Sequence, residues 1–401
     1  MLREGQEFET EHLPVLNGDE INEKLFQKLP VDSLKDKNVL VVCEDNTRAT
    51  PVHIFFPEFL QRIKDLNAHV RVLFALGTHR PMSEKEMSIK LGLSETQAES
   101  IRLQNHDATD EEQLVEVGKI NGNIFKINRS VEDSDTIITI SSVLPHRVVG
   151  FSGGAKMLCL GIGNKEFIDY THRASNQFPE DDIIGTIDNP MRKILDQQGR
   201  MVEQKYPDKN FYCISAITVP DGIVQVFVDS FQHSYEQAAS LSKDIFVKEV
   251  GPQDAILALV DDKSTDLWQA AKAIYNCARV LKDGGIIVVR GTLKDGVSVP
   301  HGKEILEYGY SNPTKIKELS DAGIIKNQLV ASHMTRVSEH LQRVKIVICS
   351  ENITEKMCKR LHVGYLDPEE LDESVFSLIV HHAVDVLLKK KITNKSDPNS
   401  V

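Results

Sequence analysis

The chain has 401 residues, of which 41% are hydrophobic, and its 59 acidic and 47 basic side chains give a net charge of −12. This length predicts two domains, each large enough for its own core. The negative charge argues against a nucleic acid partner, because a polyanionic backbone would be repelled unless basic residues were segregated. No basic run or zinc-finger spacing appears.

The N-terminal sequence has no apolar core of signal-peptide length, and no run approaches the roughly 18 apolar residues of a membrane span. We therefore expect a soluble cytoplasmic protein without a membrane partner. The six cysteines never form a Cys-x-x-Cys pair, which predicts reduced core residues and neither disulfides nor an all-cysteine metal site. They are Cys43, Cys159, Cys213, Cys277, Cys349 and Cys358.

Short β-rich apolar runs alternate with helical patterns along the chain, which predicts an α/β fold with mostly parallel sheets. Strands are expected at residues 38–43, 70–76, 135–141, 254–260, 286–290 and 343–350. Helices are expected from the capping box at Ser83, over residues 266–282 before a Gly284-Gly285 turn, and over residues 368–391.

The strand pattern restarts near Gly251, which predicts a domain boundary there. We expect an N-terminal α/β domain over residues 1–250 and a C-terminal α/β domain over residues 251–390, with an active-site cleft between them. Residues 391–401 are expected to form a disordered tail.

The loop after the first strand reads Asp45-Asn46-Thr47-Arg48-Ala49-Thr50-Pro51. The carboxyl ends of parallel strands face the crevice where α/β proteins bind ligands. Backbone N–H groups and hydroxyls there suit a phosphate, and Arg48 can hold a phosphate or a carboxylate through two parallel hydrogen bonds. Helix capping by Asp45 or Thr47, with Arg48 in solvent, is the alternative.

The loop after the second strand, Gly77-Thr78-His79-Arg80-Pro81, is expected at the same edge of the sheet. A histidine at that position can exchange a proton near neutral pH. A loop histidine bonded only to backbone remains the alternative for His79.

The loop after the third strand, PHRVVGFSGGAK from Pro145 to Lys156, has three glycines within five positions. It is no P-loop, because Lys156 follows alanine and is followed by Met157, which leaves no hydroxyl for magnesium. The apolar residues after Lys156 can desolvate its amine, lower its pKa and make it nucleophilic. The loop therefore suits covalent attachment of a carbonyl or a cofactor, and a solvated surface lysine is the alternative.

Two further segments carry residues of possible chemistry. His172 is of a type that binds nickel, zinc or copper, although a single histidine is more often structural. Gln269 and Lys272 share one face of a helix start and can grip a carboxylate, unless this face is merely exposed. A structural role is expected for His301.

In order and spacing, these motifs resemble the nickel-dependent lactate racemase family, from about Val39 to Val289. The resemblance implies a racemase or epimerase of a 2-hydroxy acid. It also implies a nickel pincer nucleotide, pyridinium-3,5-bisthiocarboxylic acid mononucleotide with nickel, which maturation proteins make. Lys156 would be its covalent anchor and His172 the protein ligand of a square-planar nickel.

By the same resemblance, His79 and His146 would be an acid/base pair on opposite faces of the substrate. They would exchange the hydroxyl proton while the Cα hydride moves reversibly to the cofactor. The remaining site residues would contact substrate or cofactor. Arg48, Gln269 and Lys272 would hold the substrate, and Asp45, Thr47, Ser152, Gly153 and Gly154 would hold the nucleotide.

Two positions depart from the family pattern. Ala49 stands where proline is usual, which makes the first loop less rigid. Trp268, the only tryptophan, stands beside Gln269 where tyrosine is usual, which changes the substrate pocket and leaves the identity of the 2-hydroxy acid open. Two other functions stay open: a Schiff-base lysine enzyme without nickel, and a non-catalytic nucleotide- or phosphate-binding protein.

Overall fold

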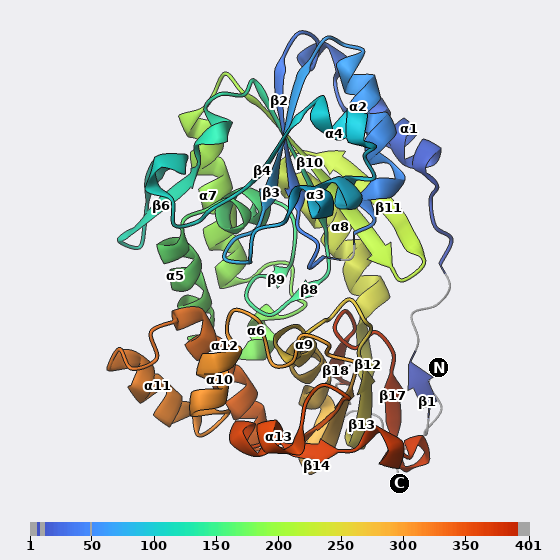
Figure 1. Ribbon diagram of the computed structural model, residues 1–401, viewed down its shortest axis with the longest axis vertical. Helices are drawn as coiled ribbons and strands as arrows, with labels where there is room; N and C mark the ends of the chain where they lie inside the picture. The colour runs from blue at the N-terminus through green and yellow to red at the C-terminus, as the bar shows by residue number, and fades with distance from the viewer. Residues whose placement is uncertain (1–5, 9–12, 49, 392–401) are drawn as a thin grey trace, which may run out of the picture. The chain divides into compact units, whose positions relative to one another are not determined.

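The computed structural model describes residues 6–8, 13–48 and 50–391 (Figure 1). The chain forms two compact units, each described here by itself. Residues 11–243 form the N-terminal unit, and residues 244–401 with residues 1–10 form the C-terminal unit. Ala49 and all of the expected tail except Lys391 lie outside the described residues.

The N-terminal unit is built on a six-stranded sheet with the order β11-β10-β7-β2-β3-β4. Its neighbouring strands are parallel except for β10 and β11. The strands are β2 (Asn38–Glu44), β3 (His69–Ala75), β4 (Arg102–Asn105), β7 (Thr136–Ser142), β10 (Asn210–Val219) and β11 (Gly222–Asp229). The three strands predicted in this half of the chain are confirmed, as is the α/β class with mostly parallel sheets.

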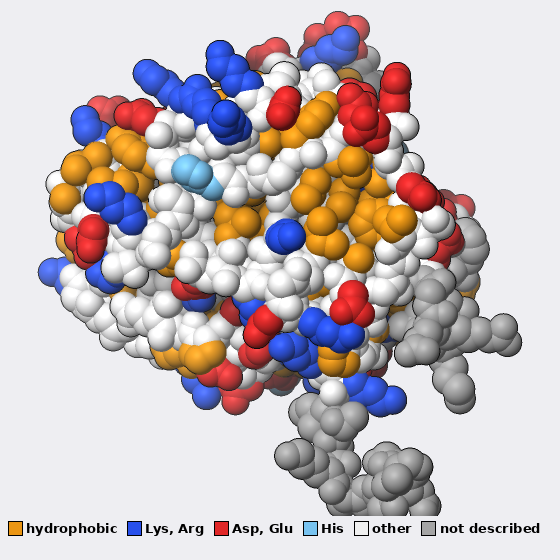
Figure 2. All heavy atoms as spheres, turned by 90° about the horizontal axis from the view of Figure 1, so that it is seen from below, with side chains coloured by type: hydrophobic (Ala, Val, Ile, Leu, Met, Phe, Trp, Pro, Cys, Tyr) orange, Lys and Arg blue, Asp and Glu red, His pale blue; other side chains and the backbone are white. Residues whose placement is uncertain are grey.

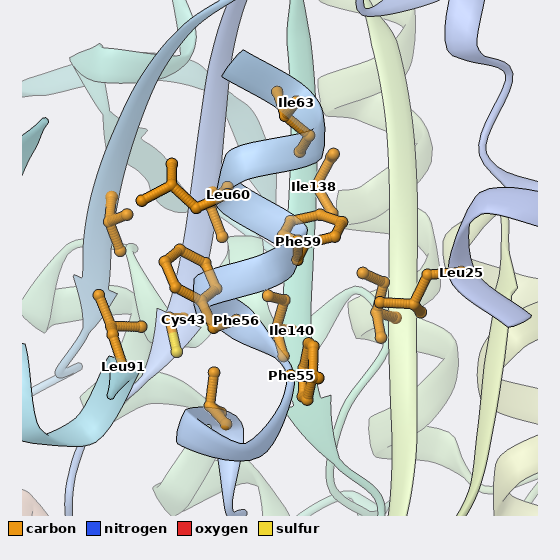
Figure 3. Packing of buried hydrophobic residues seen from close by; sticks show 14 of the residues in the cluster. Leu25, Cys43, Phe55, Phe56, Phe59, Leu60, Ile63, Leu91, Ile138 and Ile140 are labelled. Carbon is orange, nitrogen blue, oxygen red and sulfur yellow. The ribbon is translucent and has the colours of Figure 1, made fainter. Parts of the chain in front are cut away.

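Helices cover both faces of this sheet because successive side chains of a strand point to opposite faces. In β2, Val41 and Cys43 join one buried cluster, whereas Leu40 and Val42 join another. Figure 3 shows the first cluster, in which Phe59 of α2 (Phe56–Lys64) lies near Ile138 of β7. The core therefore lies on both faces, and the loops at the strand ends are left for binding.

The other elements of this unit fill the connections between the strands. The α-helices are α1 (Gly18–Lys28), α3 (Glu84–Leu91), α4 (Glu95–Glu99), α5 (Lys165–Ser175), α6 (Glu180–Ile183), α7 (Pro190–Lys205) and α8 (Phe231–Phe246), the last of which continues into the C-terminal unit. Two antiparallel pairs are β5 (Leu114–Ile120) with β6 (Asn123–Asn128), and β8 (Pro145–His146) with β9 (Gly150–Phe151). The capping box predicted at Ser83 begins α3.

The C-terminal unit contains an entirely parallel sheet with the order β1-β17-β13-β14-β15-β16. Its strands are β1 (Gln6–Phe8), β13 (Gln253–Leu259), β14 (Leu281–Arg290), β15 (Lys345–Cys349), β16 (Gly364–Leu366) and β17 (Leu378–Val380). A second parallel pair joins β12 (Val247–Val250) to β18 (Leu387–Lys390). The helices are α9 (Leu267–Cys277), α10 (Gly302–Tyr308), α11 (Pro313–Asp321), α12 (Gln328–Leu341) and α13 (Glu355–Leu361).

The long helix predicted over residues 368–391 is wrong. That segment holds two 3-10 turns and the strands β17 and β18. β17 pairs on both sides, with β1 and β13, so tertiary pairing of the β-branched Ile379 and Val380 overrides helix propensity. The turn predicted at Gly284-Gly285 is also wrong, because both glycines lie within β14 beside an irregularity in its pairing with β13.

All six cysteines are buried and unpaired, as predicted. Over the described ranges, no helix is long and apolar enough to cross a membrane. On the face shown in Figure 2, basic and acidic side chains are interspersed, with hydrophobic side chains between them.

Candidate active site

The loops that carry the candidate residues follow three adjacent parallel strands. β3, β2 and β7 are neighbours, so their carboxyl ends lie at one edge of the sheet. Asp45 follows β2, His79 follows β3, and His146 lies in β8 shortly after β7. This edge is the usual ligand-binding side of a parallel α/β sheet.

Glu44, which the sequence analysis did not select, joins two of these loops. Its carboxylate is 5% exposed and accepts hydrogen bonds from the Thr50 hydroxyl at 2.5 Å and from the Ser142 backbone N–H at 3.0 Å. The end of β7 is thereby tied to the loop after β2. An acidic residue closing the apolar run NVLVVCE was the available signal.

Asp45 and His79 form a direct pair. The His79 Nδ1 lies 2.6 Å from Oδ2 of Asp45, while Oδ1 of Asp45 accepts hydrogen bonds from the Thr47 hydroxyl at 2.6 Å and from its backbone N–H at 3.0 Å. Burial opposes ionisation of Asp45, but His79 and Arg48 hold its pKa below the usual carboxyl range. The carboxylate is therefore an anion that orients His79, whose ring is 30% exposed and accessible to a substrate.

The glycine-rich loop before Lys156 is shaped by buried contacts. Ser152 donates its hydroxyl to the Ser142 carbonyl and accepts the Leu144 N–H, each at 2.9 Å. Gly154 has a φ of +61°, and a Cβ there would lie 2.5 Å from the Arg192 guanidinium. Glycine is thus required both for the left-handed backbone and for the close approach of Arg192.

Lys156 lies at the start of a π-helix that spans Met157–Gly161. Such helices are rare and occur often at functional sites. Desolvation lowers the pKa of Lys156 to about 8, and Arg48 acts in the same direction while Glu44 and Asp45 oppose it. A larger fraction of the amine is therefore neutral and nucleophilic near pH 7 than for an ordinary lysine.

His172 lies on α5, where its Nδ1 is 2.8 Å from the Ile168 carbonyl. Because a carbonyl can only accept, Nδ1 carries the proton and Nε2 carries the lone pair. Desolvation lowers the pKa of His172 to about 3, with Arg147 acting in the same direction. A neutral imidazole with this tautomer has the form that coordinates a metal.

The structure brings five of the predicted residues of this unit together. The charges of Lys156 and His79 act on His172, and those of Asp45 and Arg48 act on Lys156. These five residues therefore share one electrostatic environment.

The candidates Trp268, Gln269 and Lys272 lie on α9 of the C-terminal unit. The Trp268 ring lies 4.6 Å from the ring of His301 and stacks on His333 at 4.2 Å and 28°. His333, which the sequence analysis missed, is bonded to the Tyr275 hydroxyl at 2.6 Å and to the Tyr310 hydroxyl at 3.1 Å. No sequence spacing marked this buried histidine.

Within the described ranges, no group of three or more histidine, cysteine, aspartate or glutamate side chains is arranged to hold a metal ion.

Comparisons with known proteins fit this geometry. The lactate racemase N-terminal domain model matches residues 21–182, a segment that includes His79, His146, Lys156 and His172. The chain is 25% identical over 388 residues to a lactate racemase of Lactiplantibacillus plantarum, covering 91% of this chain and 87% of that protein.

Two solved structures are similar to this chain. A protein from Thermotoga maritima has a TM-score of 0.82 and 27% identity, with 94% of this chain and 99% of that chain covered. The lactate racemase apoprotein from Thermoanaerobacterium thermosaccharolyticum has a TM-score of 0.79 and 19% identity, covers 94% of both chains, and supports the fold alone.

Proposed function

Because this chain belongs to the lactate racemase family, we propose that it racemises or epimerises a 2-hydroxy acid with a lysine-anchored nickel pincer nucleotide. The observation that carries the proposal is Lys156, whose pKa is lowered to about 8 at the end of a glycine-rich loop in the matched segment. A neutral amine can form the covalent bond to the cofactor, whereas a protonated amine cannot.

The chemistry of the site residues fits the proposed cofactor. Lys156 would anchor it, and His172 would offer a neutral Nε2 lone pair to nickel, which imidazole suits. Arg48 can balance a phosphate or carboxylate charge. The Ser152 hydroxyl is already hydrogen-bonded within the loop. Nucleotide binding at this position would therefore depend on the backbone groups of the neighbouring residues.

When bound, the nucleotide would supply reversible acceptance of the substrate Cα hydride. His79 and His146 would exchange the substrate's hydroxyl proton. Arg48, Gln269 and Lys272 would hold the substrate's carboxylate and nearby oxygens. The maturation proteins and a small 2-hydroxy acid would be the partners.

The test is production of the full chain alongside the maturation proteins, followed by intact mass, metal analysis and a chiral assay. We expect a cofactor-sized mass on Lys156, about one nickel per chain, and scrambling of at least one acid among lactate, malate, aliphatic and sugar 2-hydroxy acids. Absence of both adduct and nickel would contradict the proposal.

The lowered pKa of Lys156 also suits a Schiff-base enzyme that acts on a carbonyl substrate without nickel. Borohydride trapping of a substrate carbonyl on Lys156 would support that second function. Detection of nickel and the cofactor-sized adduct on the same lysine would eliminate it. Loss of scrambling in Lys156→Ala would separately exclude a non-catalytic nucleotide- or phosphate-binding protein.

We predict that His172→Ala lowers nickel affinity more than about tenfold while the mass adduct on Lys156 remains, because the lost group is a metal ligand and the anchor is intact. Metal analysis and intact mass on one sample make the measurement. His233→Ala is the control, since its side chain is 69% exposed in the same unit. Full nickel retention in His172→Ala would show that another group coordinates the metal.

We predict that Trp268→Tyr shifts the ratio of kcat/KM for lactate to that for a larger 2-hydroxy acid about tenfold towards lactate, since pocket changes of this size are worth about 1–3 kcal/mol. Stacking on His333 holds the plane of the Trp268 indole, so replacing it with tyrosine would change the shape of the proposed substrate pocket. Parallel chiral assays measure the ratio. An unchanged ratio would place Trp268 outside the substrate pocket.

A further inference from the structure

The tautomer of His79 follows from its contacts. Its Nδ1 faces Oδ2 of Asp45 at 2.6 Å and the Thr47 hydroxyl oxygen at 3.4 Å. The carboxylate can only accept, and Thr47 has already donated its hydroxyl proton to Oδ1 of Asp45 at 2.6 Å. The His79 proton must therefore be on Nδ1, which leaves the lone pair on Nε2.

The tautomer of His146 is the opposite. The backbone N–H of Val148 donates to the Nδ1 of His146 at 3.2 Å. A backbone N–H is never an acceptor, so Nδ1 carries the lone pair and a neutral ring has its proton on Nε2. This bond lies in the turn between β8 and β9, where Val148 is 2% exposed, so the hairpin itself maintains the tautomer.

We propose that the two neutral histidines are held in opposite tautomers, with the lone pair on Nε2 of His79 and the proton on Nε2 of His146. Asp45 and Thr47 are the positioning residues of His79. The inference rests on the proposed function for its catalytic meaning, and it assigns Asp45 and Thr47 a part in orienting His79.

The two rings differ in what an added proton does. On His79 a proton at Nε2 leaves the Asp45 bond intact, and the carboxylate balances the imidazolium charge. On His146 a second proton would have to enter Nδ1, where it would face the Val148 N–H. Protonation of His146 therefore requires that this bond be broken.

The two tautomers determine how the hydroxyl proton is removed from each substrate enantiomer. Where the hydroxyl faces His79, its O–H bond breaks, an N–H bond forms at Nε2, and the electron pair stays on the substrate oxygen. Where the hydroxyl faces His146, the ring must first change tautomer: Nε2 gives its proton to a solvent water, a solvent water gives one to Nδ1, and the Val148 bond breaks. The freed Nε2 lone pair then forms the new N–H bond as the substrate O–H bond breaks, and the electron pair stays on the substrate oxygen. Because racemisation has an equilibrium constant of one, kcat/KM stays equal for the two enantiomers, and the asymmetry falls on kcat and KM separately.

The test is a long-range ¹H–¹⁵N correlation spectrum of full-length protein labelled with [¹⁵N]histidine at neutral pH and prepared without the maturation proteins. The chain has 14 histidines, so His79→Gln and His146→Gln assign the two signal sets. We expect a protonated Nδ1 and bare Nε2 for His79, and the reverse for His146. The same tautomer in both rings, or averaged ring shifts, would overturn the inference.

Asp45→Asn tests the positioning role. Thr47 donates two hydrogen bonds to Oδ1, which holds the amide oxygen in place and turns the NH₂ towards His79. We expect His79 to switch to the tautomer of His146. An unmoved His79 signal would overturn the role of Asp45, since the isosteric amide preserves a merely structural contact.

Asp107→Asn is the matched control. Asp107 makes the same turn, accepting the Thr109 N–H at 2.8 Å and hydroxyl at 2.7 Å, without His79 beside it. We expect it to leave both ring spectra unchanged. The readout is independent of turnover: opposite tautomers without any racemisation would contradict the proposed function alone, and racemisation with equal tautomers would contradict this inference alone.

Discussion

Lys156→Met is expected to eliminate both the cofactor adduct and racemisation while the protein remains folded. Methionine fills a similar volume but offers no amine to attach. Lys156 begins a π-helix whose residues Met157–Gly161 are all buried, so an apolar side chain suits its surroundings. Intact mass, nickel content and a chiral assay on protein made with the maturation proteins measure the three losses together.

The stability of the same variant provides the internal control. The pKa of Lys156 is lowered from 10.5 to about 8, so folding is opposed wherever the amine is charged. Below pH 8 the amine is charged in both folded and unfolded chains, and the cost is at most about 3 kcal/mol. As the pH rises from 8 to 10.5 the folded amine is neutral while the unfolded one still binds a proton, so the cost disappears.

In protein made without the maturation proteins, Lys156→Met should therefore be more stable than the parent at pH 7, and the difference should vanish above pH 10.5. Urea unfolding at several pH values measures it. Lys193→Met, at a lysine that is 70% exposed, should show no such pH-dependent difference. Retained racemisation in Lys156→Met would contradict the anchor role, and a destabilised variant at pH 7 would contradict the pKa argument.

Much of the N-terminal unit could be predicted because its central strands are buried on both faces. A strand such as β2, with six consecutive buried residues, appears in sequence as one apolar run, and the loops that follow such runs lie at the ligand-binding edge. The helix prediction for residues 368–391 was wrong because the strands in that segment are short and leave no comparable apolar run. β17 has only three residues, and its strand state comes from pairing with β1 and β13, which no local pattern records.

Some of the site residues could be predicted from the sequence, whereas their contacts could not. Lys156 and His79 could be selected from loops that follow predicted strands. The partners of these residues could not, since Asp45 and His79 are 34 positions apart and their contact depends on the register of β2 against β3. The sequence did not indicate His333 as a site residue, because its hydrogen bonds to two tyrosines and its stacking on Trp268 form only in the folded chain.

Asp196→Ala is expected to cause the largest loss of stability among single substitutions near the site. Arg192 is 2% exposed, donates from Nε to Asp196 at 2.8 Å and from Nη1 to the Gly153 carbonyl at 3.1 Å, and lies 3.3 Å above the Tyr235 ring centroid. Removing the carboxylate leaves a buried guanidinium charge without its counter-ion. Such losses cost about 3–5 kcal/mol, and we expect about 3 because Asp196 is 23% exposed.

The measurement is urea unfolding of protein made without the maturation proteins, with Asp188→Ala as the matched control. Asp188 lies just before α7 and pairs with Lys193 of that helix at 3.0 Å. Both side chains are more than two-thirds exposed, so loss of the Asp188 carboxylate should cost less than about 0.5 kcal/mol. Equal effects of the two substitutions would show that Arg192 needs no counter-ion. A large effect confined to Asp196→Ala would mean that the loop before Lys156 depends on a buried charge: the Arg192 guanidinium that holds the Gly153 carbonyl needs Asp196 to remain there.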